Sequence, residues 1–467
     1  MRLRSFGLLA SLLGSLTSAL TLALPGAFIG SASVAHADAA TSAYVPLPAP
    51  TRLFDSRSTG GLLAAGGVAT VNVTGAAPLP APGATVAAVL NVTVVGSAGA
   101  GFWTVYPHGA TRPLAASLYV DERASMNGDA LAIPNLVTVP VGADGLVDVF
   151  TQSGGHVVVD MLGSYQLSGA TAAGRLLPLA APKRILDTRD SALLAGDSTT
   201  TFNVPNANGA TAAVLTATTI AVGPGYWTFF PTSGTRPLAA NLNSMYGLQT
   251  VANQVIVPLD AGGNFNVYTQ TGGHLILDLV ALVSGATAPV STDGLFVPLA
   301  QPTRFLDTRE PGLNPLGGTQ MALPGWSFEV PVATNPAVNR TDVAAVALNV
   351  TVTDALANSY VTLSPAGSND PTSKVRTTAT VTSARAAQIV PSHAIVGVSA
   401  RGFDVFALQG GNVIADVAGY YLGAPAPAPF AAATNTNPTT AGCVGYPTAP
   451  VGEIVLGSSK AAVTRAQ

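Results

Sequence analysis

The stretch that decides the fold is VPLPAPTRLFDSR, residues Val45–Arg57, because the chain contains it in three related forms. The other two are LPLAAPKRILDTR (Leu177–Arg189) and VPLAQPTRFLDTR (Val297–Arg309), so the shared core reads P-x-R-x-x-D-[S/T]-R. The first arginine of this motif recurs after 132 and then 120 residues. Solenoid and propeller repeats have periods of roughly 20–50 residues, so this spacing indicates a whole domain for each copy.

The three copies also agree downstream of the opening motif. Each has a strand-like run (AAVLNVTV from Ala87, AAVLTATTI from Ala212, AAVALNVTV from Ala344), and each closes on a Gly-Gly turn and an apolar run with an aspartate. The closing runs end at Tyr165, Leu282 and Tyr421. A T-R-P-L-A-A segment begins at Thr111 and at Thr235 in the first two copies, and it is missing from the third.

Within a copy the side chains alternate with a period of two, as in Val71-Asn72-Val73-Thr74, and Gly or Pro clusters bound each run. Roughly seven to nine such runs per copy, rich in β-branched and aromatic residues, predict an all-β chain. We expect three tandem antiparallel β-sandwich, jelly-roll-like domains at residues 44–165, 175–283 and 295–422. Short linkers at 166–174 and 284–294 join them, and a Pro/Ala/Thr-rich tail over 423–467 is expected to be extended and unpacked.

The composition excludes several classes of protein. Only 9% of the 467 residues are charged and 48% are hydrophobic, which argues against a helical protein with solvated faces. The 49 Gly and 35 Pro residues are too few for a low-complexity disordered chain. The net charge of −3 provides no basic surface for nucleic acid.

The first 37 residues predict export. Arg2 and Arg4 precede an apolar stretch over residues 6–29, and Ala35-His36-Ala37 has the small-x-small pattern of a cleavage site. Cleavage of a signal peptide over 1–37 is the main interpretation, and a retained membrane anchor is the alternative. No later segment predicts a membrane span, so we expect a secreted, extracellular or cell-surface protein. Cys443 is the single cysteine, so the chain has no intramolecular disulfide.

The opening P-x-R-x-x-D-T-R motif, the L-N-V-T-V strand and the V-x-D-V-x-G-Y ending together resemble a repeat module of secreted surface proteins from actinobacteria and related Gram-positive bacteria. The resemblance covers nearly all of the chain between the signal peptide and the tail. It implies an extracellular β module with no assigned catalytic role. The second copy departs from the pattern by losing the terminal Gly-Tyr, and the third by losing the T-R-P segment.

The arginines and aspartates of the repeats predict a structural ion network. We expect the opening and closing strands to meet, so that the opening charges pair with the closing aspartate in a partly buried network that fixes strand register. By strand alternation, Arg52 and Asp55 should face opposite sides of the sheet, whereas Asp55 and Arg57 should share a side. A ligand or metal site is the alternative interpretation. The network residues are Arg52, Asp55, Arg57 and Asp160; Arg184, Asp187, Arg189 and Asp278; and Arg304, Asp307, Arg309 and Asp416.

Aromatic residues near arginines are the best candidates for ligand binding, because aromatic faces stack on sugar rings and guanidinium groups bind hydroxyls. The alternative is that these aromatics fill the core. His156 and His274 occupy equivalent turns, but the third copy has Asn412 there, which favours a surface role. The ligand-binding candidates are Trp103, Tyr106 and Arg112, and Trp227, Phe229 and Arg236.

These observations predict a non-catalytic binding or scaffold protein with no cofactor and no metal. Its most concrete version is weak binding of carbohydrate or cell-wall glycans, with avidity from repetition. The alternatives are a passive spacer or assembly unit of the envelope, and an extracellular hydrolase with an unrecognised site. Exposed Trp103 and Trp227 would favour the glycan binder, and buried ones the scaffold. The oligomeric state and the packing of the modules against one another are left open.

Overall fold

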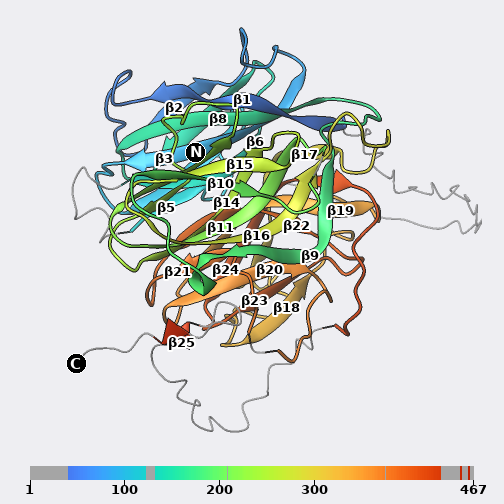
Figure 1. The fold of residues 1–467 in the computed structure, drawn as a ribbon. Coiled ribbons are helices and arrows are strands. Elements are labelled where there is room, and N and C mark those ends of the chain that lie inside the picture. Colours follow the sequence, from blue (N-terminus) through green and yellow to red (C-terminus); the bar gives the residue numbers. More distant parts are fainter. Residues whose placement is uncertain are drawn as a thin grey trace, which may run out of the picture. The chain divides into compact units, whose positions relative to one another are not determined.

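A computed structural model describes residues 40–121, 132–207, 209–373 and 375–432, and the backbone of two short strands, β25 (Glu453–Ile454) and β26 (Ala461–Ala462). The expected signal peptide over residues 1–37 and Cys443 lie outside the described residues. The chain forms three β modules in sequence order, coloured from blue through green to red (Figure 1). No helix in the described residues is long and apolar enough to cross a membrane.

Within the described residues each module contains eight strands, as the number of alternating runs predicts. The first module contains β1 (Ser42–Asp55), β2 (Val68–Asn72), β3 (Thr85–Val95), β4 (Gly101–Pro107), β5 (Leu118–Val120), β6 (Ala132–Pro140), β7 (Leu146–Thr151) and β8 (His156–Leu167). The second contains β9 (Leu176–Asp187), the 3-10 turn η2 (Thr188–Asp190), β10 (Ser198–Asn203), β11 (Ala212–Ala221), β12 (Gly225–Pro231), β13 (Leu242–Ser244), β14 (Thr250–Pro258), β15 (Asn264–Thr269) and β16 (Gly273–Val283). The third contains β17 (Phe296–Asp307), β18 (Trp326–Val330), β19 (Val343–Thr353), β20 (Ser359–Pro365), β21 (Val381–Ser383), β22 (Val390–Gly397), β23 (Phe403–Ala407) and β24 (Asn412–Leu422).

The strand order is the same in all three modules and confirms the predicted fold class. In the first module, one four-stranded layer has the order β6-β3-β8-β1 and the other has the order β2-β7-β4-β5. Numbered from the first strand of each module, these are the layers 1-8-3-6 and 2-7-4-5 of a jelly roll, built from antiparallel pairs. The layer that contains the opening and closing strands is called the inner sheet here, and the other layer is the outer sheet.

Alternating side chains from the two layers fill a core inside each module. In the first module, Leu90 and Val92 of the inner sheet meet Trp103 and Val105 of the outer sheet, and all four are at most 1% exposed. The other modules have equivalent clusters around Trp227 and around Val361. A period of two places one side of each strand in this core, which is why the alternating pattern identified the strands correctly.

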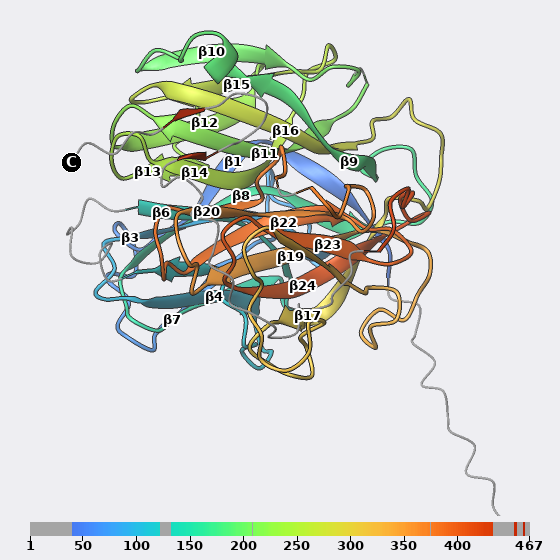
Figure 2. The same ribbon diagram turned by 90° about the horizontal axis from the view of Figure 1, so that it is seen from below.

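The three modules also pack against one another. The opening strands β1 and β17 pair at Ser42 and Phe296, which joins two inner sheets into one of eight strands. A further apolar cluster draws side chains from all three inner sheets, including Tyr165, Ile256 and Tyr421. Figure 2 shows the second module, in green and yellow, as its own group of strands beside the other two. The modules therefore share a core, which the sequence left open.

The linkers and the start of the tail are packed. Thr171 of the first linker forms an antiparallel bridge with Ser291 of the second. The buried Arg175 donates hydrogen bonds to the carbonyl oxygens of Pro289 and Asp293 at 2.6 and 2.7 Å. In the tail, Ala426 forms a parallel bridge with Ser399 of the third module. The prediction of an unpacked tail from residue 423 was therefore wrong for its first residues, because backbone hydrogen bonds hold them on the third module.

Candidate functional site

The opening motif and the closing strand of the first module meet through one arginine. Arg52 of β1 pairs in register with Asp160 of β8, and its Nε lies 2.7 Å from Asp160 Oδ1. Its Nη1 lies 3.2 Å from Asp55 Oδ2, and Arg57 contacts the same Asp55 oxygen at 2.6 Å. Arg52 is thus the link between both carboxylates, and the structure places opening and closing charges together as expected.

The second and third modules repeat these contacts. Arg184 Nε lies 2.9 Å from Asp278, and Arg304 Nε lies 2.9 Å from Asp416. The Nη1 atoms of the same two arginines reach Asp187 at 3.1 Å and Asp307 at 2.9 Å. Arg189 and Arg309 then pair with these last two carboxylates, as Arg57 does with Asp55. All twelve network residues therefore occupy equivalent positions in three copies.

One detail of the network differs from strict alternation. Arg52 and Asp55 were expected on opposite sides of the sheet, but their side chains are in contact. The register of β1 against β8 shifts between Arg52 and Phe54, and β17 against β24 shifts between Arg304 and Leu306. A bulge of this kind adds a residue to one strand and turns the following side chain to the other face. The bulge brings Asp55 onto the side of Arg52.

The two carboxylates of each network have opposite pKa shifts. Burial raises the pKa of Asp160, and the hydrogen bond and charge of Arg52 offset part of that rise. The hydrogen bond from Arg57 lowers the pKa of Asp55 to about 2. In the first two modules the closing aspartate is the more deeply buried of the two, whereas in the third module Asp307 and Asp416 are both buried.

The Nη2 atom of each linking arginine donates both to the closing aspartate of its own module and to a carbonyl oxygen of another module. Arg52 Nη2 donates to the carbonyl oxygen of Leu238 in the second module, at 2.6 Å. Arg184 Nη2 donates to the carbonyl oxygen of Thr377 in the third module, and Arg304 Nη2 donates to that of Leu114 in the first. The contacts run from the first module to the second, the second to the third and the third to the first. We call these three contact regions seam 1–2, seam 2–3 and seam 3–1.

The acceptors in the seams explain the T-R-P-L-A-A segment. Leu114 and Leu238 belong to this segment in the first two modules. In the third module its place is taken by residues 376–379. Thr362 Oγ1 donates to the carbonyl oxygen of Thr378 as Thr104 Oγ1 does to that of Ala115. Because the seams use backbone carbonyl groups, the third module keeps the contact without the sequence motif. Sequence comparison could not detect this equivalence.

The asparagine of the L-N-V-T-V strand adds a second contact to two seams. Asn91 Nδ2 donates to the carbonyl oxygen of Ala240 at 2.9 Å, across seam 1–2. Asn349 Nδ2 donates to that of Ala116 at 2.7 Å, across seam 3–1. The second module has Thr216 at this position, and a cavity of about 10 Å³ lined by Thr216 and Ala379 lies in seam 2–3. The recurrence of Asn in two copies was visible in the sequence, but its partner was not.

A buried polar cluster lies where the inner sheets of all three modules meet. His393 is 2% exposed, and its Nε2 lies 2.9 Å from Thr138 Oγ1 of the first module. Its Nδ1 lies 3.1 Å from Gln254 Oε1 of the second module. Because Gln254 Oε1 can only accept, Nδ1 carries the proton and Nε2 accepts from the threonine hydroxyl. Burial lowers the pKa of His393 to about 3, so the imidazole is neutral at neutral pH.

The six ligand-binding candidates do not form one surface. The indoles of Trp103 and Trp227 are 0% exposed and lie in the module cores, and Phe229 lies in the core beside Trp227. Tyr106, three positions after Trp103 on β4, is directed to the other face of that strand and is also buried. Only the two arginines, Arg112 and Arg236, are exposed. The structure therefore supports the core interpretation of these aromatics and presents no tryptophan face to a sugar.

The exposed arginines cover aromatic rings of the outer sheets. The Arg112 guanidinium carbon lies 3.7 Å from the ring centroid of Phe150, and that of Arg236 lies 3.7 Å from that of Tyr268. In the third module Arg376 lies 4.5 Å from the ring of Phe406, which holds the equivalent strand position. These cation–π contacts leave the covered ring faces occupied by the protein itself.

The histidines at the equivalent turns each contact a hydroxyl group that accepts a backbone N–H. His156 Nδ1 lies 3.0 Å from Ser56 Oγ, which accepts the N–H of Val157 at 2.9 Å. The third module has Asn412 at the histidine position, and Thr308 donates to its Oδ1 at 2.9 Å. Ser56 is 0% exposed, so this hydroxyl is closed to a substrate. No group of three or more metal-ligating side chains occurs within the described residues.

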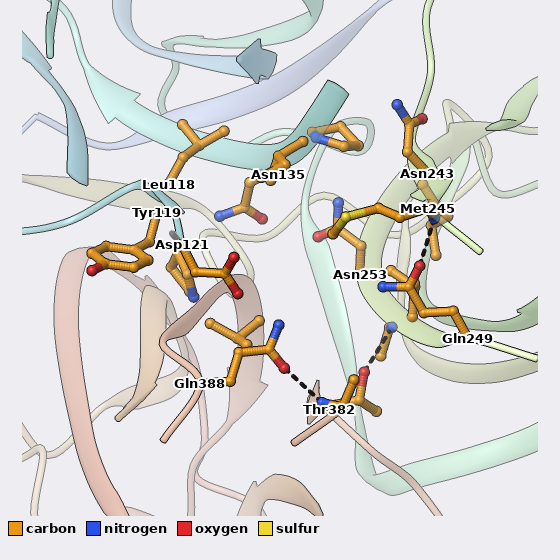
Figure 3. Close-up of a pocket in the computed structure, with 18 of the residues that line it drawn as sticks. Leu118, Tyr119, Asp121, Asn135, Asn243, Met245, Gln249, Asn253, Thr382 and Gln388 are labelled. Carbon is orange, nitrogen blue, oxygen red and sulfur yellow. Dashed lines mark hydrogen bonds between the residues drawn. The ribbon is translucent and has the colours of Figure 1, made fainter. Parts of the chain in front are cut away.

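A cavity of about 100 Å³ lies at the junction of the three modules (Figure 3). It is lined by β5 and β6 of the first module, β13 and β14 of the second, and β21 and β22 of the third. Amide side chains, among them Asn135, Gln249 and Gln388, share its wall with apolar groups. We call it the junction cavity. Because three distant segments of the chain form it, sequence reasoning gave no signal for it.

Comparison with known proteins adds no family. The chain matches none of the protein-family models scanned, and no curated protein is significantly similar to it.

Proposed function

We propose that this chain is a non-catalytic, exported scaffold protein in which three jelly-roll modules interlock into one unit. The cycle of seam contacts from Arg52, Arg184 and Arg304 carries the proposal. Each of these arginines fixes its own opening and closing strands and also binds the next module. The most regular charged residues of the repeats therefore hold the assembly together.

Two further observations support a scaffold over an enzyme. The Ser56 hydroxyl beside His156 is fully buried and accepts the backbone N–H of Val157, so it has a structural role in the turn. The strongly shifted pKa of His393 occurs in a closed polar cluster whose partners are a threonine and a glutamine. A perturbed histidine of this kind is explained by burial alone.

Calorimetry of the full chain tests the interlocked scaffold. We expect one cooperative unfolding transition for the wild type, because a shared core and three seams couple the modules. The triple variant Arg52→Ala, Arg184→Ala, Arg304→Ala should unfold in separate steps at lower temperature. Three independent transitions in the wild type would contradict the proposal. N-terminal mass analysis of protein recovered from culture medium and cell surface tests export, with Asp38 as the expected first residue.

Weak glycan binding at the outer sheets is the second candidate. The observation that favours it is the exposed guanidinium group that two modules hold at the same place, 3.7 Å from an aromatic ring, where it can donate to sugar hydroxyls although the ring face is covered. A pull-down on peptidoglycan and a glycan array, with wild type and an Arg112→Ala, Arg236→Ala variant, tests it. Binding that the double variant loses would support the glycan candidate. If neither protein binds above background, the glycan candidate is excluded and only the scaffold proposal remains.

A further inference from the structure

The junction cavity contains two amide donors with a fixed orientation. Gln249 Oε1 accepts the N–H of Met245 at 2.5 Å, and Gln388 Oε1 accepts the N–H of Ala384 at 2.7 Å. Each bond uses the amide oxygen for the protein's own turn and directs the Nε2 group away from it. Both Nε2 atoms point toward the open space of the cavity (Figure 3). Gln249 is 6% exposed, so its donor is held in a nearly enclosed position.

The described walls of the junction cavity are mostly uncharged and leave space for a compact ring. Asp121 is the one charged residue of the described lining, and its carboxylate pairs with Arg385 at 2.7 Å. Leu118, Met245 and Val251 supply apolar surface beside the amides. About 100 Å³ of space holds roughly seven to ten water molecules, which suits one small ring.

We propose that the junction cavity binds a neutral, hydroxyl-bearing ring of the size of one sugar residue. Hydroxyl groups accept from the Nε2 groups of Gln249 and Gln388, and the C–H faces of the ring contact the apolar walls. The site goes beyond the scaffold role, because it exists only where all three modules meet. It is also distinct from the outer-sheet arginines.

Calorimetric titration of the full chain with methyl β-D-glucopyranoside tests the site, with cyclohexanol and gluconate as comparisons. We expect millimolar binding of the glucoside, with weaker binding of both comparison compounds. Gln249→Glu and Gln388→Glu keep the oxygen that accepts the backbone N–H and remove the donor, so each should weaken binding about tenfold. Gln152→Glu is the matched control, because Gln152 Oε1 also accepts a backbone N–H, from Phe102 at 3.3 Å, on an exposed outer sheet.

Three results would overturn the proposal: no binding of the glucoside at millimolar concentration, equal binding by all three variants, or tighter binding of gluconate. Thermal melts check that the variants fold. If a cavity variant does not fold, crystals of the wild type soaked in the glucoside decide the question. Density for the sugar in the junction cavity supports the proposal, and ordered water alone or sugar elsewhere refutes it. The site rests on the interlocked modules, and the two tests are distinguishable: one cooperative unfolding transition without glucoside binding overturns the site and leaves the scaffold proposal intact.

Discussion

Arg52 Nη2 of the first module lies 2.6 Å from the carbonyl oxygen of Leu238 in the second module. The Nε of the same guanidinium lies 2.7 Å from Asp160, whose side chain is only 4% exposed. One planar group therefore joins a buried carboxylate to a neighbouring module. Lysine lacks the several fixed donors that this arrangement requires, which accounts for arginine in all three copies.

Substitution of Arg52 should lower the free energy of unfolding. Arg52→Ala leaves Asp160 buried without its partner and removes a seam contact, so we expect the free energy of unfolding to fall by about 3 kcal/mol. Urea denaturation followed by circular dichroism measures the change. Arg340→Ala is the control, because Arg340 and Asp342 form a pair at 2.7 Å with both side chains exposed. That variant should lose less than about 1 kcal/mol, and equal losses would show that burial of Asp160 does not matter.

Seam 2–3 lacks the asparagine contact of the other two seams, and one substitution should introduce it. Thr216→Asn places an amide where Asn91 and Asn349 donate across their seams, next to a cavity with space for about one water molecule. We expect the new hydrogen bond to the carbonyl oxygen of Ala379 to stabilise the chain by about 1 kcal/mol in urea denaturation. The reverse change, Asn91→Thr, should destabilise it by a similar amount. A stability gain from both variants would contradict the assigned role of the asparagine.

The buried indole of Trp103 should act through packing. Trp103→Ala removes a fully buried side chain, so we expect a loss of about 3–5 kcal/mol. Trp103→Phe keeps most of the apolar contact, and the indole Nε1 has no hydrogen-bond partner among the described residues, so its cost should be about 1 kcal/mol. Urea denaturation measures both. A Phe variant that stays folded but loses binding to a glycan that the wild type binds would return Trp103 to the ligand-binding candidates.

The repeats predicted the architecture because each copy carries local information. Alternation identified the strands, and the charged opening motif identified which strands meet, down to the pairing with Asp160. The bulge after Arg52 was not predictable, since nothing in the local pattern marks a shift in register.

Contacts between modules could not be predicted from the sequence, for a different reason. The seams use backbone carbonyl groups, as at Leu114 and Thr377, so the accepting residues share no side-chain signal. His393 was visible only as one of few histidines. Its partners Thr138 and Gln254 come from different modules, and the equivalent residues of the three copies differ.

The same His393 predicts how stability depends on pH. In the unfolded chain a histidine binds a proton near pH 6.5, whereas burial holds the pKa of His393 at about 3 in the folded protein. Between these values the unfolded state binds more protons than the folded state. The free energy of unfolding should therefore decrease as the pH falls from about 6.5 toward 3, by up to about 1.4 kcal/mol per pH unit from this residue.

His393→Gln isolates this contribution, because the variant has no proton to bind in either state while other groups titrate as before. Urea denaturation between pH 4 and pH 7 should show a shallower pH dependence for the variant than for the wild type. His108→Gln is the control, since the hydrogen bond that this exposed histidine donates to Asp144 raises its pKa. Its contribution has the opposite sign, because a raised pKa stabilises the folded state at low pH. Parallel curves for the wild type and His393→Gln would show that the polar cluster admits a proton or water at low pH, and would contradict the closed arrangement of Thr138, Gln254 and His393.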